Sequence, residues 1–203
     1  MNNYEYIIAS LPVIEQGGRG SSLDADSLVE EIRGQLSKRD DRTVAMLLDG
    51  FDSEKLTPEF YSAVLDSGCD FLREYFSYDL EMRNAKVAYL NRTLGRPEGQ
   101  DVMVLGDPEA EKPEFEDIEK VDAVLECGNI LDREKGLDDM MWEKIDSLTY
   151  MDVLNLNVIL GFIAKLKIVD RWNRLDPETG MQFFRKLVEE IRSTYDNKKQ
   201  NMI

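Results

Sequence analysis

The sequence contains no histidine among its 203 residues. Imidazole is the one side chain that ordinarily titrates near neutral pH, and it is the commonest metal ligand in proteins. Its absence excludes Ser-His-Asp and Cys-His nucleophilic centres, histidine-containing zinc sites and di-metal sites built on Glu-x-x-His motifs. We therefore expect no catalytic residues, no metal site and no cofactor.

Cysteine is also scarce, since only Cys69 and Cys127 occur. Two thiols are too few for a zinc–thiolate site, and the chain lacks the cysteine density of a secreted scaffold held by disulfides. This usage favours a reducing, cytosolic compartment.

Long apolar runs are missing. The most apolar stretch, residues 153–164, is interrupted by Asn155 and Asn157 and is shorter than the roughly 20 residues that a membrane-spanning helix needs. The N-terminal residues have neither the basic region nor the apolar stretch of a signal peptide. We expect neither secretion nor direct membrane insertion.

Positive charge is in short supply: 25 Lys and Arg residues stand against 41 Asp and Glu residues, a net charge of -16. Nucleic-acid binding needs clustered cations to neutralise phosphates, so we expect no nucleic-acid partner. Residues 98–139 hold fifteen acids and four bases, a net of -11, whereas residues 165–199 hold nine bases and six acids, a net of +3. The acidic segment is suited to a solvated surface or to steering toward a basic partner.

Apolar residues recur at helical spacing along most of the chain, which predicts a mainly α fold. Strand-like signals are confined to the first dozen residues and to residues 102–105, and residues 4–12 are compatible with either a short strand or a helix ending near Pro12. Thr57-Pro58 is a typical helix start, and residues 69–94 predict one helix of roughly 40 Å that ends at Gly95.

Three of the six prolines lie between residues 97 and 113, in a stretch without apolar periodicity. This pattern predicts a two-lobed helical bundle: an N-terminal lobe with the long helix (1–96), an acidic linker (97–114) and a C-terminal lobe (115–203).

In the second half we expect a helix from Phe115 to Leu131 and a short helix from Leu137 to Leu148. A capping box at Thr149-x-x-Asp152 then predicts the start of a central helix through Ile163, and Asp176-Pro177 predicts the start of the last helix. Trp142 and Trp172 are expected in the core, and the neighbouring Asp138 and Asp139 on the solvated surface.

Charged residues on the two longest predicted helices are candidates for partner contacts. Asp79, Arg83 and Lys86 are four and three residues apart, a spacing that equally allows simple stabilisation within the helix. Near the end of the central helix, cations also suit the helix dipole. The candidate partner-binding residues are Asp79, Arg83, Lys86, Arg92, Arg96, Lys165 and Arg171.

Several segments resemble the C/d subunit of V-type and archaeal-type rotary ATPases. They are residues 137–146 (LDDMMWEKID), residues 159–172 (ILGFIAKLKIVDRW) and residues 71–86, which contain FLRE and DLEMRNAK. The N-terminal YEYIIASLP resembles a smaller bacterial family of undefined function that accompanies V-type ATPase subunits, and with that family the resemblance covers most of the chain.

The resemblance implies an all-helical, non-catalytic part of the central stalk that is similar to the C/d subunit, with rotor and membrane-ring subunits as partners. It also implies a cytoplasmic protein peripherally associated with a membrane complex. The C/d subunit has three similar helical lobes arranged as a funnel, whereas this chain has room for about two, so the funnel does not carry over.

Two other hypotheses stand beside this one. The first is an unrelated helical adaptor or regulator whose acidic segment binds a basic protein. The second is an enzyme that uses only carboxylates, Tyr and Lys. A force-transmitting protein is expected to lack a deep cavity lined by converging ionisable groups.

Overall fold

The computed structural model describes residues 3–16, 23–106 and 115–175. These residues form a mainly helical fold that contains no strand within the described ranges. The elements are α1 (Tyr4–Ser10), α2 (Ala25–Gln35), α3 (Lys38–Asp49), a 3-10 turn η1 (Ser53–Lys55), α4 (Pro58–Leu65), α5 (Asp70–Leu94), α6 (Ile118–Leu125), α7 (Ile130–Thr149) and α8 (Leu156–Asn173). The last helix expected from Asp176 and the glycine-rich stretch at 17–22 lie outside the described residues.

Local signals set the starts of the early helices. Asp24 caps α2 by accepting a hydrogen bond from the Ser27 backbone N–H, and Thr57 caps α4 in the same way, with Pro58 in the first turn. The open choice for residues 4–12 is settled as a helix, α1, whose Ile7 is fully buried.

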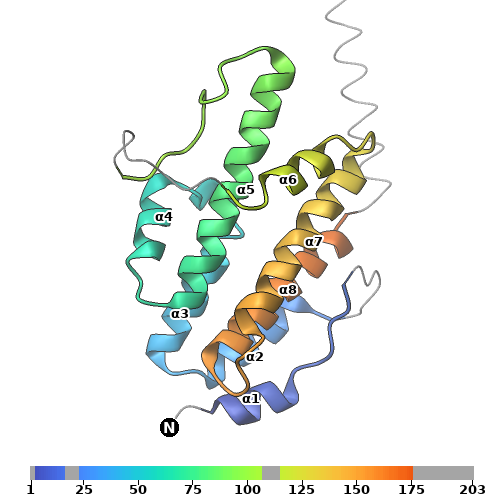
Figure 1. The fold of residues 1–203 in the computed structure, drawn as a ribbon. Coiled ribbons are helices and arrows are strands. Elements are labelled where there is room, and N and C mark those ends of the chain that lie inside the picture. Colours follow the sequence, from blue (N-terminus) through green and yellow to red (C-terminus); the bar gives the residue numbers. More distant parts are fainter. Residues whose placement is uncertain (1–2, 17–22, 107–114, 176–203) are drawn as a thin grey trace, which may run out of the picture.

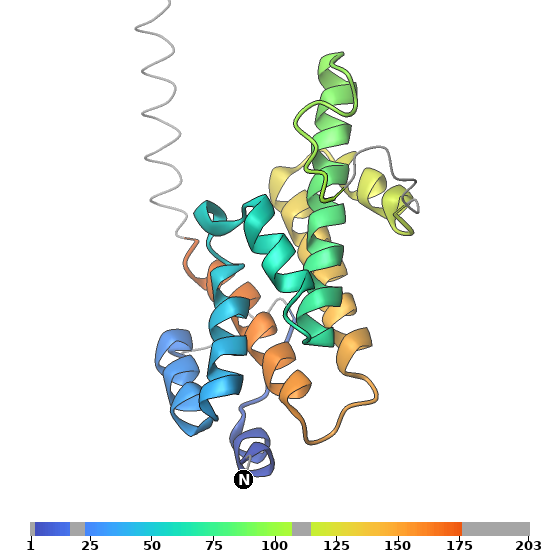
Figure 2. The same ribbon diagram turned by 90° about the vertical axis from the view of Figure 1, so that its left-hand side faces the viewer.

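The long helix predicted from residues 69–94 is confirmed as α5, with Cys69 at its N-cap. Its 25 residues span about 37 Å at the α-helical rise. Gly95 ends it in the left-handed conformation (φ 65°), which costs glycine nothing. Figures 1 and 2 show the C-terminal turns of α5 projecting beyond the other helices.

Two predicted boundaries in the second half are wrong. α6 ends at Leu125, and α7 is one helix of 20 residues that begins after Asn129, whose side chain accepts from the Leu131 N–H. Gly136 does not interrupt α7: a Cβ there would lie 2.7 Å from Val124 Cγ1, so the missing side chain allows α6 to pack closely on α7.

The second error concerns the start of α8. Thr149 is the last residue of α7 and its hydroxyl donates to the Ile145 carbonyl, while α8 starts later with Asn155 as its cap. The central position expected for this helix is confirmed, because Ile159, Leu160 and Ile163 are completely buried.

α7 packs against both α5 and α8. α4 packs on α5, α6 packs on α5 and α7, and α1, α2 and α3 each pack on α8. The buried side chains of all these helices form one cluster. The division into lobes at residues 97–114 stays a prediction, and helices from both sides of it contribute to this common core.

The described part of the predicted linker is held against α5. The buried Asn91 donates its side-chain N–H groups to the carbonyls of Gln100 (2.6 Å) and Glu98 (3.2 Å). Two helical turns earlier, Asn84 both donates to and accepts from the backbone of Met103. Within the described residues, no helix has the length and apolar character needed to cross a membrane.

Candidate functional site

The seven predicted partner-binding residues lie on α5 and α8, except for Arg96, which is exposed just after the end of α5. The structure brings three of them, Asp79, Arg83 and Arg171, to one cavity. The other four lie outside it.

Three of the residues outside the cavity form ion pairs between helices. Each of these cations connects α5 or α8 to an acidic residue on a neighbouring helix, an arrangement that contributes about 0–1 kcal/mol per exposed pair. The pairs are Lys86 with Glu134 at 3.2 Å, Arg92 with Asp122 at 2.5 Å, and Lys165 with Asp146.

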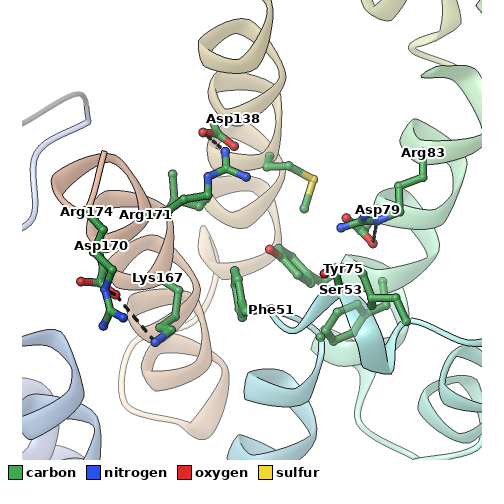
Figure 3. A pocket seen from close by; sticks show the side chains of 15 residues that line it. Phe51, Ser53, Tyr75, Asp79, Arg83, Asp138, Lys167, Asp170, Arg171 and Arg174 are labelled. Atoms are coloured by element: carbon green, nitrogen blue, oxygen red, sulfur yellow. Dashed lines mark hydrogen bonds and ion pairs between the residues drawn. The ribbon is translucent and has the colours of Figure 1, made fainter. Parts of the chain in front are cut away.

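The cavity has a volume of about 480 Å³ and lies between the α3–η1 segment, α5, α7 and α8. Figure 3 shows α5 residues on one wall, α8 residues on the facing wall and Asp138 of α7 between them. Phe51, Tyr75 and Phe76 supply apolar surface, and the Phe51 and Tyr75 rings are 6.4 Å apart. A volume of this size is typical of small-molecule sites.

On the α5 wall, Arg83 Nε donates to Asp79 Oδ2 at 2.7 Å. The same carboxylate oxygen accepts the Tyr61 hydroxyl at 2.8 Å. Burial, followed by the negative charge of Asp79, raises the pKa of Tyr61, so this hydroxyl stays protonated and donating. Asp79 thus fixes the guanidinium of Arg83 at the cavity wall.

On the opposite wall, Asp138 accepts hydrogen bonds from Arg171 and from Trp172 Nε1, the latter at 2.6 Å. Asp138 is only 9% exposed, so its predicted place on the solvated surface is wrong. Burial raises the pKa of this carboxyl, and the favourable interactions with Arg171 and Trp172 offset only part of that effect. The expected core position of Trp142 is confirmed, whereas Trp172 is half-buried.

Tyr75 lies between the two walls and is buried. Its pKa is raised above the ordinary tyrosine value, first by burial and then by the negative charges of Asp79 and Asp138. The hydroxyl is therefore a proton-bearing group at any physiological pH and does not act as a base.

The C-terminal end of α8 adds a second charged group to the cavity. Lys167 and Arg174 both contact Asp170, at 3.9 Å and 2.9 Å, and both reach Asp26 at the start of α2. These bonds also tie α2 to α8. Bonds to Arg174 and Lys167 lower the pKa of Asp26, so this carboxylate stays ionised.

Ionisable groups from three helices converge on this cavity, which is partly open to solvent rather than enclosed. Its charged side chains are paired with one another as carboxylate–cation pairs. Neither cysteine lines it, and Ser53 contributes the only aliphatic hydroxyl among its lining residues. Among the residues that the structure describes, no group of three or more His, Cys, Asp or Glu side chains is arranged to hold a metal ion.

A second, open groove of about 770 Å³ lies on the other side of α5 and α7. It has an acidic character, with Glu81, Glu116, Asp117 and Glu143 surrounding Lys144. Its aromatic residues are Tyr78 and Phe115, whose ring centroids are 5.3 Å apart.

Sequence reasoning missed the Asp138–Arg171 pair because the partners are 33 residues apart in the chain. One signal for the burial of Asp138 was present. Asp138 shares its helix face with Met141, Trp142 and Ile145 at spacings of three, four and seven residues, so it occupies a position in the apolar stripe.

Comparison with known proteins gives one match. The family model described as a protein of unknown function (DUF2764) matches residues 51–195. No curated protein and no solved structure matches the chain.

Proposed function

The chain belongs to the DUF2764 family, and we propose that it is a non-catalytic subunit of a V-type rotary ATPase. In this role it couples the central rotor shaft to the membrane ring, from the cytoplasmic side and without entering the bilayer. The family match contains the segments 71–86, 137–146 and 159–172 that resemble the C/d subunit, and these segments form much of α5, α7 and α8.

An exposed apolar turn between α7 and α8 carries the proposal. Tyr150, Met151, Val153 and Leu154 are 83%, 85%, 74% and 48% exposed. The turn is held in shape by Asp152, which accepts hydrogen bonds from the side chains of Asn155 and Asn157 at 2.5 and 2.9 Å. A contiguous apolar patch on an ordered turn is typical of a surface that contacts a partner.

The turn and the projecting end of α5 lie at opposite ends of the bundle in Figures 1 and 2. A protein that joins two neighbours needs two separate contact surfaces, and this arrangement supports such a role.

The turn carries no positive charge. No Lys or Arg occurs between Lys144 and Lys165, whereas Asp146 precedes the turn and Asp152 lies within it. This charge distribution favours a protein over an anionic lipid surface as the contact.

The experiment is co-purification of the tagged native chain from gently solubilised membranes. We expect rotor-shaft and membrane-ring subunits to be recovered. A variant with Tyr150→Ser, Met151→Ser and Val153→Ser should lose ring subunits while keeping its helicity, because these side chains are exposed in the free chain.

The matched control changes two exposed apolar residues at the other end of α7, Ile130→Ser and Leu131→Ser, which are 72% and 52% exposed. This control should retain the ring subunits. Recovery of neither shaft nor ring subunits with the unaltered chain would refute the proposal.

Charge reversal at Arg83 and Lys86 tests the predicted contact role of the α5 residues. Weakened assembly with unchanged helicity would support that role. Loss of helicity or stability would show that the pairs with Asp79 and Glu134 serve the fold instead.

The acidic groove formed by α5, α7 and residues 115–117 favours a second candidate function, a helical adaptor that binds a basic protein. Four carboxylates around one lysine, beside an aromatic pair, would attract a segment rich in Lys or Arg. Binding of a basic partner should then weaken steeply with salt. Turnover of a metabolite by the purified chain, abolished by one carboxylate substitution, would exclude both candidates.

A further inference from the structure

In the cavity between α5 and α8, the acidic side chains are more buried than the arginines that pair with them. The carboxylates of Asp79, Asp138 and Asp170 are 15%, 12% and 16% exposed, whereas their arginine partners Arg83, Arg171 and Arg174 are 49%, 54% and 61% exposed. The acids are therefore the more buried partners, and the arginine side chains are the more accessible ones.

Each arginine is held in place by its aspartate but uses only some of its N–H donors in that contact. A guanidinium carries five N–H donors in a planar fork. Arg83 donates to Asp79 through Nε, and Arg171 donates to Asp138 through Nη2. Positioned arginines of this kind are the usual means of binding phosphoryl groups, because the fork matches two oxygens at once.

The charge balance of the cavity also differs from that of the chain. Four cations and three carboxylates line it, in a chain of net charge -16. Asp26 contacts Lys167 and Arg174 from outside the lining, so each cation has a carboxylate counterpart and the cavity is close to neutral. Arg83 and Arg171 lie on opposite walls in Figure 3, and each retains N–H donors that its bond to aspartate does not use.

The rest of the wall suits a flat apolar group. Phe51, with the Tyr75 ring 6.4 Å away, lies next to the charged residues, and the volume of about 480 Å³ exceeds what a lone phosphate needs. We propose that this cavity binds a phosphorylated small molecule that carries a planar ring, with Arg83 and Arg171 holding phosphoryl oxygens and Phe51 contacting the ring. The site is independent of the rotary-ATPase proposal and goes beyond it.

Calorimetric titration of the full chain with ADP and, separately, with pyrophosphate tests the site. We expect saturable binding of both, with ADP binding more tightly because it adds the ring contact. Arg83→Gln and Arg171→Gln should each weaken both ligands about tenfold or more, the usual loss for a charge-assisted hydrogen bond. Phe51→Leu should weaken ADP and leave pyrophosphate unchanged.

Arg92→Gln is the matched control, because Arg92 is also an α5 arginine paired with an aspartate, but lies outside the cavity. It should leave both affinities within about twofold, as expected for one distant surface charge that is screened by salt. Circular dichroism checks that each variant is folded. Absence of saturable ADP binding at millimolar concentration, or an equal loss in Arg92→Gln, would overturn the proposal.

Discussion

Gly50 lies where α3 ends, in the wall of the charged cavity, and replacing it with alanine tests how tightly this wall is packed. A Cβ at Gly50 would lie 2.1 Å from two ring carbons of Phe76. Gly50 has an ordinary right-handed helical conformation, so alanine adds no backbone strain and the whole effect comes from this overlap.

Phe76 cannot easily move away. Its side chain is 1% exposed and its ring contacts the rings of Phe60 and Tyr75 at centroid distances of 5.1 and 5.0 Å. Overpacking a filled site costs about 1–3 kcal/mol, and the glycine-to-alanine change offsets about 0.4–1 kcal/mol of it through the unfolded chain. We expect Gly50→Ala to lose about 1 kcal/mol of unfolding free energy, a fall in Tm of roughly 2–4 °C for a chain of this size.

Urea unfolding followed by circular dichroism measures the change. Gly34→Ala is the control, since a Cβ there meets nothing within 4 Å and alanine should stabilise α2 by up to about 1 kcal/mol. In a double-mutant cycle, Phe76→Leu should relieve the overlap, giving a coupling energy of about 1 kcal/mol or more with Gly50→Ala. Unchanged stability of Gly50→Ala, or additive effects in the cycle, would refute the packing argument.

Further predictions concern polar groups in or near the core. Asp138→Asn should leave stability at pH 7 unchanged or higher, because burial disfavours the charged carboxylate. Asp138→Ala should lose about 1–3 kcal/mol by leaving Trp172 Nε1 without its acceptor. The pKa of Asp138 in the folded state lies above the unfolded value of 3.8, so the native state binds the proton first as pH falls. The free energy of unfolding contributed by this group therefore rises as pH falls from the folded pKa toward 3.8. Asp138→Asn should remove this part of the pH dependence when urea unfolding is measured at a series of acidic pH values. Asn91→Ala should release residues 98–101 from α5, which hydrogen exchange would detect as faster exchange there, with α5 itself still protected and Met103 still held by Asn84.

The sequence was sufficient where structure depends on near neighbours. Thr57-Pro58 and Gly95 set helix ends through their own side chains or backbone, and these predictions were confirmed. The mainly α class followed from periodicity in the same way. The break expected between Leu131 and Leu137 and the capping role expected of Thr149 were wrong. α7 continues through Gly136, which packs against Val124 of α6, and the Thr149 hydroxyl donates to the Ile145 carbonyl within α7.

The candidate site depended even more on distant contacts. Asp79 and Arg83 are one helical turn apart, so their pairing was predictable from spacing. Arg171 lies across the cavity from them because α5 and α8 both pack on α7. The spacing of residues along the sequence does not predict this packing.

The position of α8 in the bundle has a consequence for how the chain is made. α1, α2 and α3 all bury their apolar faces on this helix, which is synthesised roughly 100 residues after α3, so a ribosome working at 5–20 residues per second needs about 5–20 s to supply it. During that interval Ile7, Val29 and Val44 lack the helix on which α1, α2 and α3 pack. We therefore expect the nascent N-terminal region to expose apolar side chains that chaperones bind, and the bundle to complete its folding only after α8 has left the exit tunnel.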